Sequence, residues 1–288
     1  MNQLMSLSIV IPVYNEESSI ASFLNELFLA LSRVEFSYEV IIVDDGSNDG
    51  TRDVLKRHAY SIQLVSHVVN RGYGAALKSG VRQSQYENIL IIDADLTYVP
   101  KDMFSLISAM SGQDMIVGAR IGKYVQIPLV RRPAKWVLNQ LANYMAGIKI
   151  PDLNSGFRII KKDLILKYIK VLPDGFSFTT TITIALLTNG YKVNYVPIQY
   201  HTRSGKSKIR PIRDTLNFFK LVIRTTLYFS PLKVFLPISG LFFLGFLISF
   251  SVDVYHMNMT EKTILLFVSA CMILSISCLA DLLDKRLP

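Results

Sequence analysis

Cysteine is scarce in this chain of 288 residues, and its two cysteines, Cys271 and Cys278, lie in one apolar segment near the C-terminus. Seven residues apart on one helix, they would be about 10 Å apart along the axis, too far for a disulfide. The four histidines are scattered, so no cluster of His and Cys competes for a metal ion. The sequence therefore excludes a disulfide framework and is typical of a reducing compartment.

Other common signals are missing as well. No basic start precedes the first apolar run, so we expect no signal peptide. There is no P-loop, and no G-x-G-x-x-G motif opens the first helix, so a dinucleotide enzyme is not expected. Charged residues make up only 18% of the chain and hydrophobic residues 50%, which is apolar for a wholly soluble protein.

The net charge of +9 is concentrated in one segment. Residues 201–233 hold four Lys and four Arg against the single acid Asp214, a balance of +7. Nucleic acid, anionic lipid and bound phosphate are all candidate partners for such a segment. Two uncharged apolar stretches, Val234–Val252 and Thr263–Ala280, follow it, and each is about as long as a membrane-spanning helix. We therefore expect a membrane as the partner and not nucleic acid.

The charges that flank the two stretches predict their orientation. Lys233 precedes the pair and Lys285 and Arg286 follow it, whereas the loop between the stretches contains a single Lys, Lys262, and no Arg. By the positive-inside rule, both termini and the main domain are cytoplasmic. The alternative, two buried helices of a soluble core, is disfavoured by their length and lack of charge. Within residues 211–232, basic residues lie between apolar positions at helical spacing, which predicts an amphipathic helix in the membrane interface.

The first 200 residues alternate between strand and helix patterns. We expect strands at residues 7–14, 38–46, 62–69, 88–96 and 114–120, a turn and strand at 152–160, and a closing strand at 191–200. Helical patterns separate the first five strands, and two more are expected at 131–147 and 178–190. This alternation predicts a parallel sheet covered by helices, in which ligands bind beyond the carboxyl ends of the strands.

Polar residues follow all five of the first strands: residues 15–17, 44–47, 70–72, 93–95 and 118–120. Aspartate is a good turn former, so one acid pair at a strand end would be ordinary. Polar groups at every carboxyl end are better explained by a ligand crevice. Asp93 and Asp95, spaced D-x-D, offer the hard oxygen ligands that suit Mg²⁺ or Mn²⁺, and such a cation can bridge a diphosphate.

Seven segments, taken in order, resemble glycosyltransferase family 2: "SIVIPVYNEE", "VIIVDDGSNDGT", "NRGYGAAL", "DADL", "GAR", "NSGFR" and "HTRSGKSK". The resemblance covers about residues 6–210 and implies the GT-A fold, a mixed, mostly parallel sheet flanked by helices. With the paired C-terminal helices, the chain is similar to the polyprenyl-phosphate branch, the dolichol-phosphate mannose synthase-like and GtrB-like enzymes. We expect a catalytic domain over 1–210, a juxtamembrane helix over 211–232 and a transmembrane hairpin over 233–288.

The resemblance also implies roles on the donor side. The residues expected to line the nucleotide pocket are Pro12, Tyr14 and Glu16, with Asp44 or Asp45 bonded to the base or ribose. The metal and the diphosphate would be held by Asp93, Ala94 and Asp95. The residues expected to contact phosphates, as guanidinium forks or as point charges, are Arg120, Arg131, Arg132, Arg203 and Lys208. Gly72, Gly74 and Gly156 are expected to serve backbone geometry.

On the acceptor side, the resemblance points to Ser155, Arg158 and Thr179. Many family 2 enzymes that glycosylate a hydroxyl carry a general base at the start of the helix after the "SGF" region. Here that helix offers Thr179, Thr180 and Thr181, and no carboxylate lies nearer than Asp174. A phosphate acceptor arrives ionised and needs no base, although Asp174 stays open as an alternative base.

The leading hypothesis is a metal-dependent, inverting transfer of a hexose from a UDP- or GDP-linked sugar to polyprenyl phosphate, undecaprenyl or dolichyl. It would take place at the cytoplasmic face of the inner membrane, with a separate flippase moving the product. The resemblance allows for a homo-oligomer. Within the same class, the alternative acceptor is a hydroxyl of a lipid-linked saccharide or polysaccharide. The alternative of another class is a non-catalytic membrane-attached module that binds nucleotide sugars.

Overall fold

The centre of the molecule is a seven-stranded sheet of order β3-β2-β1-β4-β6-β5-β7. The computed structural model describes residues 6–57, 61–120, 140, 142–144, 146–201, 223, 227–228 and 231–286. The strands are β1 (Leu7–Val13), β2 (Tyr38–Asp44), β3 (Gln63–Ser66), β4 (Asn88–Ile91), β5 (Met115–Ala119), β6 (Arg158–Lys161) and β7 (Val193–Pro197). Neighbouring strands are parallel except for β6, which runs antiparallel to both β4 and β5. The predicted mixed, mostly parallel sheet is confirmed.

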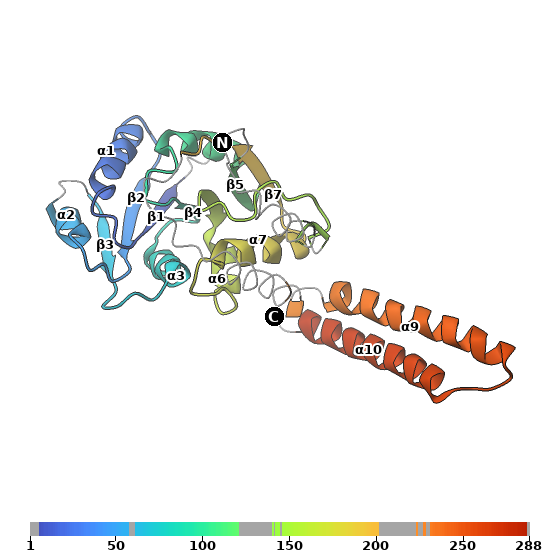
Figure 1. Ribbon diagram of the computed structural model, residues 1–288. Coiled ribbons are helices and arrows are strands. Elements are labelled where there is room, and N and C mark those ends of the chain that lie inside the picture. Colours follow the sequence, from blue (N-terminus) through green and yellow to red (C-terminus); the bar gives the residue numbers. More distant parts are fainter. Residues whose placement is uncertain are drawn as a thin grey trace.

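Helices cover both faces of the sheet (Figure 1). The hydrophobic core on one face joins the sheet to α1 (Ile20–Leu31) and α4 (Met103–Ala109), and the core on the other face joins it to α3 (Tyr73–Gln83), α6 (Lys162–Tyr168) and α7 (Phe178–Thr188). Successive strand residues point to opposite faces, so Ile9 and Ile11 belong to the first core and Val10 to the second. A shorter helix, α2 (Thr51–Arg57), lies beside α1.

Several details differ from the sequence prediction, and most strands are shorter than predicted. β3 ends at Ser66 instead of residue 69, and the side chain of Val68 beyond it is 97% exposed. Residues Pro100–Asp102 form a 3₁₀ turn, η1, before the α-helix begins at Met103. Helix α6 was not predicted, because it follows β6 directly, with no Gly or Pro between them to mark a boundary. Most of the helix predicted at 131–147 lies outside the described residues.

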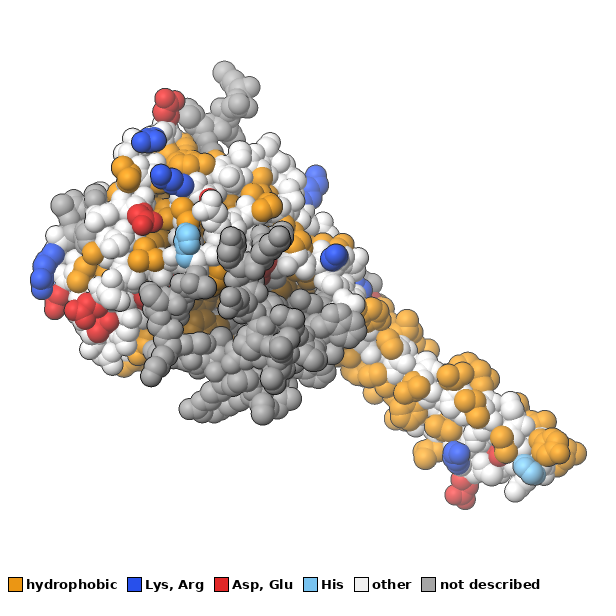
Figure 2. All heavy atoms as spheres, turned by 45° about the horizontal axis from the view of Figure 1, so that its top comes forward, with side chains coloured by type: hydrophobic (Ala, Val, Ile, Leu, Met, Phe, Trp, Pro, Cys, Tyr) orange, Lys and Arg blue, Asp and Glu red, His pale blue; other side chains and the backbone are white. Residues whose placement is uncertain are grey.

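The C-terminal part is a hairpin of two long helices, α9 (Pro231–Tyr255) and α10 (Glu261–Arg286), that projects away from the sheet domain (Figure 1). Both are long and apolar enough to cross a membrane, and little of either is buried. Figure 2 shows hydrophobic side chains over most of the hairpin surface, with charged side chains near its tip. An exposed apolar hairpin is unlike the buried core helices of the alternative hypothesis and supports a membrane-bound protein. The juxtamembrane helix predicted over 211–232 lies almost wholly outside the described residues.

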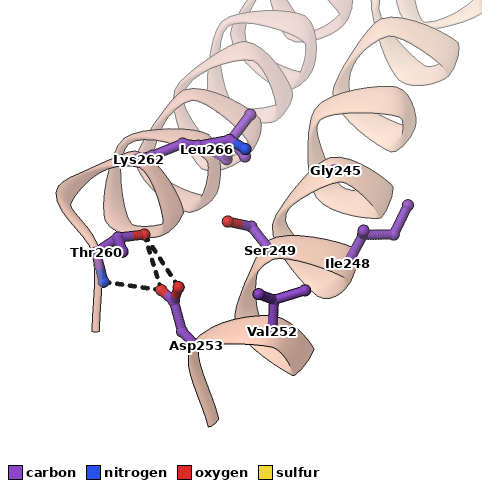
Figure 3. A pocket seen from close by; sticks show the side chains of 8 residues that line it. All are labelled: Gly245, Ile248, Ser249, Val252, Asp253, Thr260, Lys262 and Leu266. Carbon is purple, nitrogen blue, oxygen red and sulfur yellow. Dashed lines mark hydrogen bonds between the residues drawn. The ribbon is translucent and has the colours of Figure 1, made fainter. Parts of the chain in front are cut away.

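A polar cluster joins the two helices near the tip of the hairpin (Figure 3). The side chain of Asp253 in α9 is buried, and it accepts hydrogen bonds from the backbone N–H of Thr260 at 2.8 Å and from the Thr263 hydroxyl at 2.6 Å. Ser249 lies 2.7 Å from the same Thr263 hydroxyl. Asp253 therefore closes the loop and satisfies a backbone donor next to the start of α10.

Candidate active site

The loops after β1 and β2 are joined to each other at the carboxyl edge of the sheet. The backbone N–H of Asn15 donates to Ser47 Oγ at 3.0 Å, and that of Asn48 donates to Asn15 Oδ1 at 2.9 Å. The backbone N–H of Glu16 donates to Thr51 Oγ1 at 2.9 Å. Tyr14 is 37% exposed at this edge, and Pro12 and Glu16 are partly exposed, so the predicted nucleotide-pocket residues lie together on one rim.

Both acids of the "DDGS" motif are buried and bonded within the protein. Asp44 accepts the backbone N–H of Ser47 through Oδ1, and Arg52 Nε through Oδ2, each at 2.9 Å. Asp45 accepts the N–H groups of Arg71 and Gly72 at 2.9 and 2.8 Å, and lies 2.6 Å from His67 Nδ1. This placement favours a role in holding the strand-end loops together over the predicted direct contact with the base.

The acid pair lies where β4 ends. The carboxylate of Asp93 accepts the hydroxyl of Tyr73, at the start of α3, through Oδ1 at 3.0 Å. Asp95 accepts both the backbone N–H and the hydroxyl of Thr97 through Oδ1, the latter at 2.6 Å. Ala94 between the two acids is buried. Burial and the negative charge of Asp95 raise the pKa of Asp93 to about 6.

These two carboxylates fit a divalent cation. Both side chains are only partly exposed and carry the same charge two residues apart, so each raises the cost of ionising the other, and a cation would relieve that repulsion. Among the described residues no three His, Cys, Asp or Glu side chains form a cluster that could hold a metal ion. Mg²⁺ needs no such cage, because it usually takes one or two carboxylates and completes its shell with water and substrate phosphates.

Gly156 lies against the Asp93 carboxylate, because a Cβ atom on Gly156 would overlap that carboxylate. Its backbone N–H donates to the Tyr98 hydroxyl at 2.9 Å, which fixes the approach. We expect Gly156→Ala to displace Asp93 and to lower kcat for sugar transfer by about 100-fold. The matched control is Gly175→Ala, because a Cβ there meets nothing within 4 Å. Unchanged kcat in the Gly156 variant would contradict the placement of Asp93 in the reaction.

The predicted acceptor residues Ser155 and Arg158 are fully buried. Arg158 donates through Nε to the Ser155 carbonyl at 3.0 Å, and through Nη1 to the Thr179 carbonyl at 3.1 Å and to Thr183 Oγ1 at 2.9 Å. Burial lowers the pKa of its guanidinium. Arg158 thus ties the 155–156 segment to the first turn of α7, a placement that favours a positioning role over direct contact with an acceptor.

Thr179, Thr180 and Thr181 are buried in the first turn of α7. The hydroxyl of Thr180 donates to Asn154 Oδ1 at 2.6 Å, so this turn lies beside the segment that packs on Asp93. Asp174, the alternative base, is paired with Lys78 at 2.7 Å, and its side chain is 63% exposed. Among the described residues, the first turn of α7 therefore holds hydroxyls and no carboxylate.

Of the predicted phosphate-binding cations, the structure describes only Arg120. It makes a two-point ion pair with Asp152, with Nε 2.7 Å from Oδ2 and Nη2 2.9 Å from Oδ1. This pair lowers the pKa of Asp152, and it uses donors that were predicted to face phosphate. Arg131, Arg132, Arg203 and Lys208 lie outside the described residues. The chain that leads to Arg203 passes the acid pair, because the N–H of His201 donates to the Thr97 carbonyl at 2.9 Å.

Tyr73, His67 and Asp152 contribute to the site but were not predicted from the sequence. Tyr73 lies within the quoted "NRGYG" segment, and its ring stacks on Phe176 with centroids 5.7 Å apart. Phe176 itself is 85% exposed on the loop before α7. The sequence alone indicates that these residues lie near strand ends, but it does not show in which direction each side chain points.

The sheet order and the antiparallel β6 beside the acid pair define a GT-A type fold. Among solved structures, glucosyl-3-phosphoglycerate synthase from Mycobacterium tuberculosis is similar with a TM-score of 0.60 at 20% identity, over 77% of this chain and 78% of that one. Mannosyl-3-phosphoglycerate synthase from Rubrobacter xylanophilus gives a TM-score of 0.59 at 18% identity, over 77% and 73%. At such identities the likeness shows the fold alone.

The chain belongs to glycosyl transferase family 2, whose family model matches residues 8–169. A second model, the GtrB C-terminal hairpin, matches residues 230–284. The predicted family and branch are confirmed.

Three relatives show what the chain is similar to. Dodecaprenyl-phosphate galacturonate synthase of Rhizobium johnstonii is 27% identical over 72% of this chain, which spans only 62% of that protein's length. An undecaprenyl-phosphate 4-deoxy-4-formamido-L-arabinose transferase of Pseudomonas fluorescens is 27% identical over 88% of this chain and 73% of its own. An undecaprenyl-phosphate mannosyltransferase of Micrococcus luteus is 27% identical over 69% and 86%.

Proposed function

We propose that this glycosyltransferase moves a hexose from a UDP- or GDP-linked sugar onto the phosphate of a polyprenyl phosphate. The observation that carries the choice of acceptor is the first turn of α7. It presents Thr179–Thr181, while the nearest acid, Asp174, is paired with Lys78. The names of the relatives, which refer to dodecaprenyl and undecaprenyl phosphates, support the same class of acceptor.

In the proposed reaction a phosphate oxygen of the lipid attacks the anomeric carbon of the sugar with inversion, and the bond from that carbon to the nucleoside diphosphate breaks. No proton has to be removed from the attacking phosphate. Asp93 and Asp95 would hold a Mg²⁺ or Mn²⁺ ion, which supplies positive charge to the leaving diphosphate. The glucosyl-3-phosphoglycerate synthase was crystallised in complex with Mn²⁺ and uridine diphosphate, which supports this use of the fold. This chain's own residues would orient Asp93 through Tyr73 and Gly156. The basic side chains that follow His201 in the sequence would contact the diphosphate.

We place the reaction at the cytoplasmic face of the inner membrane, with both termini on that side. The catalytic domain would end near residue 210, the juxtamembrane helix near 232, and the hairpin would anchor the protein. Lys233 in the first turn of α9 and Lys285 and Arg286 at the end of α10 support this orientation. Because two helices offer no path for a lipid-linked sugar, a separate flippase would carry the product across. A homo-oligomer is compatible with this arrangement.

The direct test is transfer of label to lipid. Membranes that contain the protein are incubated with Mn²⁺, undecaprenyl phosphate and radiolabelled UDP-glucose, GDP-mannose and related donors, beside membranes that contain the Asp95→Asn variant. Label is expected in an organic-extractable, mild-acid-labile product that depends on one of the donors, and the variant is expected to lose it. Label that enters only polysaccharide would favour the hydroxyl acceptor. Binding of nucleotide sugar with no transfer from any donor would favour the non-catalytic module.

Asp174→Asn separates the two kinds of acceptor. With a phosphate acceptor no base is required, so kcat is expected to stay within about threefold of wild type, whereas loss of a general base costs about 10²–10⁴-fold. The side chain is mostly exposed, so the substitution leaves folding intact. A loss of kcat of about 100-fold, with the melting temperature unchanged, would identify Asp174 as a base and overturn the phosphate acceptor.

A further inference from the structure

A chain of hydrogen bonds links Asp45 after β2 and His67 after β3 to helix α3, and the proposed reaction gives it no step. His67 Nε2 lies 2.9 Å from the hydroxyl of Ser79 on α3, and His67 Nδ1 lies 2.6 Å from Asp45 Oδ1. His67 and Asp45 are only 7% and 3% exposed. With its proton on Nδ1, the imidazole donates to Asp45 and accepts the Ser79 hydroxyl, so one tautomer satisfies every group in the chain.

The order Ser–His–Asp is that of a hydrolase triad, but the surroundings of Ser79 exclude that chemistry. Ser79 lies inside α3 (Tyr73–Gln83), where backbone N–H groups are bonded along the helix. A triad needs a pair of free donors beside the nucleophile to hold the oxyanion, and a helix interior has none. The chain therefore serves geometry.

Asp45 links His67 to the backbone that precedes Tyr73, the residue whose hydroxyl contacts Asp93. Its two oxygens accept the N–H groups of Arg71 and Gly72, directly before α3 begins at Tyr73. Gly72 has φ 103°, a left-handed value that favours glycine, so this junction has one well-defined shape. On its other side the junction is fixed by the N–H of Ala75, which donates to the Asp174 carbonyl at 3.0 Å. Tyr73 is held at both ends of its turn, and its hydroxyl meets Asp93.

We infer that His67 is a positioning residue for the metal site, acting through Asp45 and the 71–72 backbone to place the Tyr73 hydroxyl on Asp93. The inference rests on the proposed function in so far as Asp93 is taken to bind the metal. Removal of hydrogen bonds to a metal's ligands typically weakens metal binding by about 10–100-fold. His67 is two bonded groups further away and should have an effect at the low end of that range.

The test is a double-mutant cycle read out as Mn²⁺ affinity, with Mn²⁺ alone as the probe and free Mn²⁺ followed by electron paramagnetic resonance. Tyr73→Phe is expected to weaken binding by about tenfold or more, and His67→Ala by about tenfold. Because His67 acts through Tyr73, the double variant should bind as weakly as Tyr73→Phe alone, within about twofold. His67→Asn, which keeps a donor for Asp45, should return affinity to within about threefold of wild type.

A pair of serine variants distinguishes positioning from general destabilisation. Ser79→Ala removes the outer link of the chain, and its control, Ser84→Ala, removes a hydroxyl that donates to the Val81 carbonyl at the end of α3, outside the chain. Only Ser79→Ala should lower Mn²⁺ affinity. Losses that multiply in the double variant, or a His67→Ala variant with a lower melting temperature and wild-type affinity, would overturn the inference. No Mn²⁺ binding by the wild type would overturn it too, whereas the lipid-transfer assay tests the proposed function separately.

Discussion

Replacing Asp93 with asparagine is expected to stop sugar transfer and, at the same time, to stabilise the metal-free protein at neutral pH. Asparagine keeps an oxygen for the Tyr73 hydroxyl but loses the charge that a divalent cation needs. The pKa of Asp93 is about 6 in the folded protein against 3.8 for an unperturbed aspartate. The folded state therefore binds this proton more tightly than the unfolded chain, so stability falls as the pH rises from about 4 to about 6 and stays at the lower level above that.

Thermal unfolding of the metal-free protein at several pH values tests this loss of stability. In EDTA, the wild type should lose melting temperature relative to Asp93→Asn as the pH rises from about 4 to about 6, the difference should stay constant above that, and the two proteins should converge below about pH 4. At about pH 7.5 the variant should melt a few degrees higher, since about 1 kcal/mol shifts a domain of this size by roughly 2–4 °C. Mn²⁺ should raise the melting temperature of the wild type only. A variant that melts below the wild type at that pH would contradict the strained acid pair, and Asp53→Asn on the exposed surface of α2 is the control.

Arg158→Lys is expected to destabilise the catalytic domain by about 3–5 kcal/mol, because a buried charge would keep its position but lose most of its hydrogen bonds. The guanidinium fork reaches carbonyls on two separate segments, those of Ser155 and Thr179, and also the Thr183 hydroxyl. A single ammonium group cannot bond to all three with the same geometry. Arg158→Met should cost less, because methionine leaves the carbonyls without a donor but also removes the cost of burying a charge.

Thermal unfolding in detergent, followed by circular dichroism, checks this order. The lysine variant should melt roughly 10 °C below the wild type and the methionine variant between the two. Arg82→Lys, at an exposed position of α3, should melt with the wild type. A lysine variant that melts within about 2 °C of the wild type would show that Arg158 does not hold the 155–156 segment to α7.

Much of the fold was predictable because its signals are local. Buried strands such as β1 and β4 are mostly apolar, and the polar groups after each of them predicted a crevice at one edge of the sheet. Asp93 and Asp95 lie at that edge for this reason. The direction of β6 was not readable from its pattern, because a strand of only four residues looks the same in parallel and antiparallel pairing.

The partners of the polar side chains could not be predicted, since they come from distant parts of the chain. Arg120 was predicted to face phosphate, but its carboxylate partner Asp152 lies 32 residues further along. In the sequence, Arg158 is a polar residue after a glycine-containing turn. A shift of one residue in strand register would turn its side chain to the opposite face of the sheet, so the pattern does not fix the direction of the side chain. Only the fold shows that its side chain points inward, toward α7.

The polar cluster around Asp253, near the tip of the hairpin, affects how the chain inserts into the bilayer. If the hairpin loop lies outside, as we propose, this carboxylate has to traverse the hydrocarbon during biogenesis, and a lone aspartate at the centre of a helix opposes insertion by about 2.5–3.5 kcal/mol. Its acceptors are satisfied by Thr260 and Thr263, from the loop and the following helix. Because these hydrogen bonds need both helices, the cost of moving Asp253 through the hydrocarbon is lower when the helices are already paired. The two helices should therefore insert together as one preassembled unit.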